Sequence, residues 1–149
     1  MNERLIKNWN SRVKSEDTVI FLGDFCFRNS PGGKDGEGDS NKAEFYKNML
    51  HGEIVFVRGN HDGNNSLNTK IKSLVMDLGG MEVFCIHDPA YANLRYRINL
   101  CGHVHQNWKF QKVGKTIIVN VGVDVWNYMP VTFDEILKEL KKQYPKWRL

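Results

Sequence analysis

Residues 53–63 read EIVFVRGNHDG, an apolar run that ends in a glycine followed by polar side chains. The Ile, Val and Phe residues of 53–57 predict a short strand that is buried on both faces. Asn60 and His61 follow this strand closely, and open sheets hold their functional side chains at the ends of their strands. The stretch therefore predicts a sheet protein with a polar site at a strand end.

The same arrangement occurs three more times along the chain. In each case an apolar run predicts a strand, and residues that can bind a metal ion follow it closely. The runs are residues 18–22, 81–86 and 97–100, and the residues that follow them are Asp24, His87, His103 and His105. One excursion and return of the chain fits between successive runs, so these strand ends can converge on one edge of the sheet.

Outside these runs, the sequence pattern predicts helices, one further strand and a loop. The predicted helices are residues 1–14, 42–50 and 132–144, the strand is residues 116–121, and the glycine-rich loop is residues 29–41. Residues 68–76 fit either a helix or a loop. Helices alternate with strands early in the chain and strands follow one another later. This order predicts an α/β fold with a mixed sheet or two packed sheets.

The composition is typical of a soluble globular domain. The chain has 149 residues, of which 41% are hydrophobic and 26% charged, and we expect residues 1–149 to form a single domain. No window approaches the roughly 18 apolar residues of a membrane span, and the polar start lacks a secretory signal, so we expect a cytoplasmic protein without a membrane partner. The net charge of +4 is spread along the chain, which argues against nucleic acid as a partner.

The three cysteines, Cys26, Cys85 and Cys101, are predicted to be reduced thiols. Each lies in or beside an apolar run, and no two have the CxxC spacing typical of a zinc site. We therefore expect a metal site, if there is one, to use other ligands.

Imidazole, carboxylate and amide oxygen together suit divalent first-row metals such as Mn, Fe, Co, Ni or Zn. A carboxylate such as that of Asp24 can bridge two ions, and two ions about 3.5–4 Å apart can share a water and clamp a phosphoryl group. His103 and His105 are two residues apart, which on an extended chain places both imidazoles on the same side. Each residue also has a plainer interpretation when taken alone. These are a turn residue for His61, a core histidine for His87, a loop carboxylate for Asp24 and surface positions for His103 and His105.

Taken in order, these motifs resemble those of the calcineurin-like metallophosphoesterase superfamily. The motifs are Gly23-Asp24, Gly59-Asn60-His61-Asp62, the single His87 and Gly102-His103-Val104-His105. The resemblance extends over about residues 19–130, and residues 120–130 are similar to the closing segment of small bacterial and phage members. It implies a four-layered sandwich of two mixed β-sheets flanked by helices.

The resemblance also implies a ligand set for two divalent transition metal ions. Asp24 would bridge both ions, and His105 would bind the first. Asn60, His87 and His103 would complete the site of the second ion. The metal could be Mn, Fe, Zn, Co or Ni, since all of these suit such ligands.

His61 is the residue to which the resemblance assigns catalysis. It would contact the phosphate and protonate the leaving oxygen, while Asp62 would orient it. The implied activity is hydrolysis of phosphomonoesters or phosphodiesters by a metal-bound hydroxide at the two-metal centre. The substrate would be a nucleotide or another small phosphoester.

The chain departs from the family pattern at its start. Family members open with a strand that ends in Asp-x-His, and no such motif stands upstream of Asp24. The chain thus resembles a member that lacks roughly its first 25–30 residues, a domain incomplete at its N-terminus. Only Asp24 and His105 would remain at the first metal site, so one ion rather than two could bind. The gap in the sheet predicts either a less stable domain or self-association, in which the domain borrows a strand from another chain. The alternative to an enzyme is a non-catalytic metal-binding or scaffolding protein.

Overall fold

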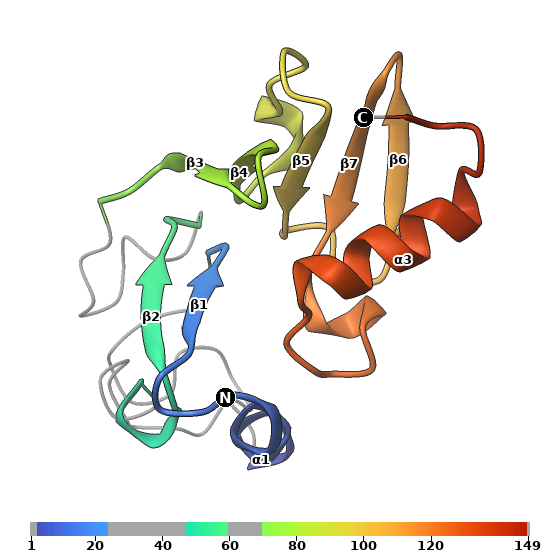
Figure 1. The fold of residues 1–149 in the computed structure, drawn as a ribbon. Helices are drawn as coiled ribbons and strands as arrows, with labels where there is room; N and C mark the ends of the chain where they lie inside the picture. Colours follow the sequence, from blue (N-terminus) through green and yellow to red (C-terminus); the bar gives the residue numbers. More distant parts are fainter. Residues whose placement is uncertain (1–2, 24–46, 60–69, 149) are drawn as a thin grey trace.

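The computed structural model describes residues 3–23, 47–59 and 70–148 and contains two β-sheets (Figure 1). The first sheet pairs β1 (Thr18–Phe21) in parallel with β2 (Glu53–Phe56). The second sheet has five strands in the order β3-β4-β5-β7-β6. These strands are β3 (Ser73–Asp77), β4 (Glu82–Ile86), β5 (Ile98–Cys101), β6 (Phe110–Val113) and β7 (Thr116–Asn120).

The five-stranded sheet is mixed. Its central strands β4, β5 and β7 run parallel, whereas β3 and β6 run antiparallel to their neighbours at the two edges. The central strands β5 and β7 are buried along their whole length, as expected for parallel strands covered on both faces. Figure 1 shows β1 and β2 ending close to the carboxyl end of β5, so strand ends from both sheets meet.

Two apolar clusters hold the layers together. In the larger one, Leu22 and Val57, which follow β1 and β2, pack with buried residues of β4, β5 and β7. Helix α3 (Phe133–Gln143) adds Ile136 and Leu140 to the same cluster. In the smaller one, Trp9 of α1 (Glu3–Arg12) packs with Val13 and Leu50 against the first sheet.

Residues of β1 alternate between the two clusters. Ile20 packs in the larger cluster, whereas Val19 and Phe21 pack in the smaller one beneath α1. Successive side chains of a strand point to opposite faces, so this alternation means that both faces of β1 are covered. Both faces are covered as the apolar run predicts, although Val19, Ile20 and Phe21 are half-buried rather than fully buried.

A capping box starts helix α3. The Thr132 hydroxyl accepts a hydrogen bond from the Glu135 backbone N–H at 3.2 Å, and Glu135 Oε1 accepts one from the Thr132 backbone N–H at 3.1 Å. These bonds satisfy N–H groups that have no partner inside the helix.

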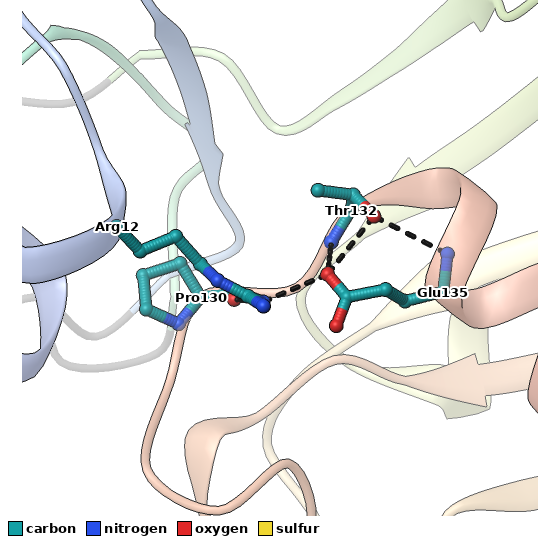
Figure 2. Close-up of polar contacts among 4 residues, drawn as sticks. All are labelled: Arg12, Pro130, Thr132 and Glu135. Carbon is teal, nitrogen blue, oxygen red and sulfur yellow. Dashed lines mark hydrogen bonds and ion pairs between the residues drawn. The ribbon is translucent and has the colours of Figure 1, made fainter.

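Arg12 connects α1 to this capping box, as Figure 2 shows. Its Nη1 donates to Glu135 Oε1 at 2.7 Å and to the Pro130 carbonyl at 2.8 Å. Burial raises the pKa of the Glu135 carboxyl, but the hydrogen bonds from Thr132 and Arg12 outweigh it and hold that pKa below its usual value. The contact ties the helix beside the first sheet to the start of the helix beside the second.

The α/β fold with two sheets and accompanying helices agrees with the sequence prediction. Strand β3 overlaps residues 68–76, for which the sequence predicts a helix or a loop, so that prediction is wrong from Ser73 on. Strand β6 has no counterpart among the predicted strands. Of the predicted helix 42–50, residues 47–49 are described and helical. The predicted loop 29–41 and Cys26 lie outside the described residues.

Cys85 and Cys101 are buried free thiols, in line with the prediction of reduced cysteines. Burial raises the pKa of each to about 12, and the nearby Asp88 carboxylate adds to the effect at Cys101. Across the described ranges, the structure contains no helix long and apolar enough to cross a membrane.

Candidate metal centre

Strand ends from both sheets converge around His87, which directly follows β4. A Cβ atom added to Gly23, after β1, would lie 2.5 Å from His87 Nδ1 and 2.7 Å from the Cα of Gly59. A Cβ atom at Gly102, after β5, would lie 3.7 Å from the same nitrogen. The three glycines directly precede Asp24, Asn60 and His103 in the sequence.

A hydrogen bond with a backbone carbonyl fixes the orientation of the His87 ring. Only 5% of this residue is exposed, and its Nδ1 lies 2.7 Å from the Leu22 carbonyl oxygen. Because a carbonyl oxygen can only accept a hydrogen bond, Nδ1 carries the proton. In the neutral ring Nε2 therefore presents a lone pair, and a metal ligand needs such a nitrogen.

Nε2 of His87 faces Nδ1 of His103 at a distance of 3.1 Å. The two rings meet edge to face, with centroids 4.9 Å apart. Two nitrogens that each lie about 2.1 Å from one ion, at an angle of roughly 90–110°, are about 3.0–3.4 Å apart. The observed separation therefore fits a pair of imidazoles that share one metal ion.

His103 and His105 lie in a tight turn, so the expectation of an extended chain is wrong here. Strand β5 ends at Cys101, and His103 and His105 have φ angles of 70° and 49°. The Val104 N–H donates to the Gly102 carbonyl at 2.8 Å, which makes His103 the central residue of a γ-turn with positive φ. This turn is rare and strained for residues other than glycine.

A carboxylate accompanies each of these two histidines. His103 Nε2 lies 3.8 Å from Asp88 Oδ2, and His105 Nδ1 lies 3.5 Å from Asp124 Oδ2. Asp88 also caps the short helix Pro89–Tyr91, whose Ala90 N–H donates to it at 2.9 Å. Metal-binding histidines typically direct their second ring nitrogen toward such a carboxylate.

The histidines differ in their exposure to solvent. The side chain of His103 is 39% exposed and that of His105 is 75% exposed, in contrast to the buried His87. A ligand from solution can therefore reach the pair at His103, whereas His87 is buried and its Nδ1 lies against the Leu22 carbonyl.

Four predicted site residues lie outside the described residues: Asp24, Asn60, His61 and Asp62. The structure brings His87 and His103 together and places His105 on the same turn as His103. Within residues 3–23, 47–59 and 70–148, no three His, Cys, Asp or Glu side chains gather closely enough to hold a metal ion by themselves. The observed pair is half of the four-residue set that the motifs predict for one ion.

Sequence reasoning assigned no role to several groups that support these histidines. They are the Leu22 carbonyl, Asp88, Asp124 and Asn120. Asp88 directly follows His87, and this position beside a predicted metal ligand was the available signal for a supporting role. A backbone carbonyl 65 positions away leaves no signal in a single sequence.

Comparisons with known proteins identify relatives of this chain. The profile of the calcineurin-like phosphoesterase superfamily domain matches residues 1–131. An uncharacterized protein of Methanocaldococcus jannaschii is 35% identical in an alignment of 150 residues. The alignment covers 95% of this chain and 76% of the relative.

Two solved structures share the fold at low sequence identity. A protein of unknown function from Aquifex aeolicus has a TM-score of 0.65 at 20% identity, over 91% of this chain and 83% of that one. Vps29 from Chaetomium thermophilum has a TM-score of 0.51 at 13% identity, over 81% of this chain and 63% of that one. With the profile match covering most of its length, the chain belongs to the calcineurin-like phosphoesterase superfamily.

Proposed function

We propose that this protein is a metal-dependent hydrolase of phosphomonoesters or phosphodiesters. The observation that carries the proposal is the 3.1 Å approach of His87 Nε2 to His103 Nδ1, with Nδ1 of His87 occupied by the Leu22 carbonyl. This arrangement leaves two imidazole nitrogens facing each other at the spacing that one divalent ion requires. Membership of a phosphoesterase superfamily supports a phosphoester as the substrate.

His87 and His103 would hold one ion together with Asn60 and Asp24. A second ion would have only Asp24 and His105 as ligands from the predicted set, so this chain could bind one ion rather than two. Mn, Fe, Zn, Co and Ni all suit this ligand set. Bound metal would supply Lewis acidity toward the phosphoryl oxygens and a lowered pKa of water. In this proposal His61 delivers the proton to the leaving oxygen.

The described residues prepare the site in two ways. The Leu22 carbonyl selects one tautomer of His87, so the ring does not have to rearrange when a ligand binds. Asp88 lies 3.8 Å from His103 Nε2, the nitrogen on the other side of the ring from His87, and Asp124 lies 3.5 Å from His105 Nδ1, so each carboxylate can help to orient its ring.

Hydrolysis of p-nitrophenyl phosphate and bis-p-nitrophenyl phosphate with Mn²⁺ tests the proposal. We expect turnover of at least one ester, inhibition by EDTA, and a loss of about 100-fold or more in His103→Ala because a metal ligand is removed. His51→Ala is the matched control. His51 lies outside the predicted site, and its Nδ1 lies 3.1 Å from the Val13 carbonyl oxygen, so activity should persist.

The outcomes separate the two candidate functions. Metal binding without turnover of either ester, with Mn²⁺, Zn²⁺, Co²⁺, Ni²⁺ and Fe²⁺ each tried, would overturn the hydrolase and favour the non-catalytic metal-binding protein. Equal activity in His103→Ala and the wild-type protein would remove His103 from the site.

A further inference from the structure

We propose that Asn120, the last residue of β7, is a positioning residue that holds the turn carrying His103 and His105 in its binding conformation. The inference rests on the proposed function, because it assigns the support of the same site. Asn120 is completely buried and has no described contact with either imidazole, so it would act through the backbone.

Both polar atoms of the Asn120 side chain form hydrogen bonds with backbone groups of two segments. Its Nδ2 donates to the carbonyl oxygens of His105, at 2.7 Å, and Trp108, at 2.9 Å. Its Oδ1 accepts from the Gly122 N–H at 2.9 Å. Since a backbone N–H must meet the oxygen, the orientation of the amide is fixed by its partners. One side chain thus binds both the turn after β5 and the segment after β7.

The backbone of Asn120 adds two further bonds between these segments. Its N–H donates to the Lys109 carbonyl at 2.8 Å, and its carbonyl oxygen accepts from Trp126 Nε1 at 2.7 Å. Asp124, which lies 3.5 Å from His105, is held between Gly122 and Trp126. Asn120 therefore fixes both the histidine turn and the carboxylate that faces it.

The turn needs such support because of its backbone. His103 and His105 both adopt positive φ, a conformation that persists only where the surroundings enforce it. The bond from Asn120 to the His105 carbonyl lies directly at the second of these residues. Relaxation of the turn would carry His103 Nδ1 away from His87 Nε2. The strained backbone of the turn and the 3.1 Å approach of the two nitrogens would therefore both depend on the hydrogen bonds of Asn120.

Asn99 provides a matched control in the same sheet. It is also completely buried, and its Nδ2 donates to the carbonyl oxygens of Asn93, at 2.9 Å, and Tyr96, at 3.5 Å. Its Oδ1 accepts from the Asn93 N–H at 2.7 Å. The two asparagines have the same burial and the same kind of partners, but Asn99 holds a turn that carries no predicted ligand.

The experiment compares Asn120→Asp with Asn99→Asp. Each change places a carboxylate oxygen against two carbonyl oxygens in a buried site, so both variants should unfold at a lower temperature. Calorimetric titration with Mn²⁺, at a temperature where all variants are folded, should show an affinity loss of about 10–100-fold in Asn120→Asp and less than about twofold in Asn99→Asp.

A second measurement on metal-free protein does not depend on metal binding. Long-range ¹H–¹⁵N spectra of the histidine side chains should show His87 protonated at Nδ1 in the wild-type protein and in Asn99→Asp. In Asn120→Asp the ¹⁵N signals of His103 should move toward those of an unconstrained imidazole, because its contact with His87 is lost.

If Asn120→Asp does not fold, Gly122→Ala takes its place. The added methyl group would lie 2.9 Å from Asn120 Oδ1 and would displace the amide without changing it, so we expect smaller losses in the same direction. Wild-type affinity and wild-type His103 signals in the folded variant would overturn the inference, as would equal losses of affinity in Asn99→Asp. If the wild-type protein itself binds no Mn²⁺, the proposed metal centre fails, and the metal-free spectra still decide the role of Asn120.

Discussion

At Gly23 the backbone has no room for a side chain. Its φ is 96°, which favours glycine, and the space that a Cβ would need is occupied by His87 Nδ1 and by the backbone of Gly59. The residue is therefore a contact point between strand ends of the two sheets. Any side chain there would push apart the groups that fix the His87 ring.

Gly23→Ala should lower the free energy of unfolding by about 2–4 kcal/mol, the sum of a strained φ and an overpacked site. Gly114→Ala is the control. That glycine has a φ of 61° but no atom within 4 Å of the added Cβ, so only the strain, about 1 kcal/mol, should appear. Urea denaturation of both variants measures the difference, and equal losses would show that the space around Gly23 can relax.

The apolar runs located His87 and His103 at strand ends, and their Nε2 and Nδ1 atoms lie 3.1 Å apart, but their role as metal ligands stays a prediction. The local backbone could not be predicted from the sequence. The turn at His103 could not be predicted, because histidine is not a typical turn-forming residue and the bond that closes the turn, from the Val104 N–H to the Gly102 carbonyl, is between backbone groups. Asp24 and Asn60 stay predictions, since they lie outside the described residues.

Among the elements, α3 shows how a local signal gains a long-range partner. The Thr132 and Glu135 pair could be read as a helix start from their spacing alone. The Arg12 guanidinium that joins Glu135 from α1 could not, because 123 positions separate the two residues.

The coupling of Arg12 to Glu135 should depend on pH. Because the pKa of Glu135 is lowered in the folded protein, its stabilising effect is present above the unfolded pKa of about 4.5 and is lost as the pH falls through the folded value. A double-mutant cycle with Arg12→Met and Glu135→Gln should give about 0.5 kcal/mol at pH 7, since the side chains are 37% and 40% exposed.

This coupling should vanish in acid, where the carboxyl group is neutral. Glu139→Gln serves as the control, because Glu139 lies on the same helix without an ion pair in the described part of the chain. A coupling that stayed constant from pH 7 to pH 3 would assign the contact to packing rather than charge.

The strands missed by sequence reasoning are the two edges of the larger sheet. Strand β6 (FQKV) has no continuous apolar run, and that of β3 is only three residues long, Leu74 to Met76. In the structure β6 exposes three of its four residues and β3 exposes alternate residues. Their pairing is decided by β4 and β7, which supply the hydrogen-bonding partners. The apolar pattern of the sequence therefore detected the buried strands. It did not detect the edge strands, which form because they pair with a neighbour and not because they are buried.

For the whole molecule, the candidate centre joins the two sheets. Leu22, Gly23 and Gly59 belong to segments that leave the first sheet, whereas His87 and His103 follow strands of the second. The sequence pattern allowed one mixed sheet or two packed sheets, and the family resemblance implied two. Neither could show that Leu22, Val57 and α3 share one apolar cluster, because periodicity identifies a buried face and not its partner.

A metal ion bound at this junction should stabilise the entire fold. At a free Mn²⁺ concentration about 100 times the dissociation constant, the free energy of unfolding should rise by about 2.7 kcal/mol. Thermal unfolding with Mn²⁺ and then with EDTA measures the effect. His103→Ala should abolish the increase, and a full increase in that variant would place the ion elsewhere.

The bond between Leu22 and His87 also sets an order of events during synthesis. These partners are 65 positions apart, and the turn at His103 is completed only when Asn120 has been added. At roughly 5–20 residues per second, the ribosome needs roughly 5–20 s to extend the chain from Leu22 to Asn120. The histidines and the residue that supports their turn are therefore synthesised after both strands of the first sheet, and metal can act on the complete candidate centre only once the chain has reached Asn120.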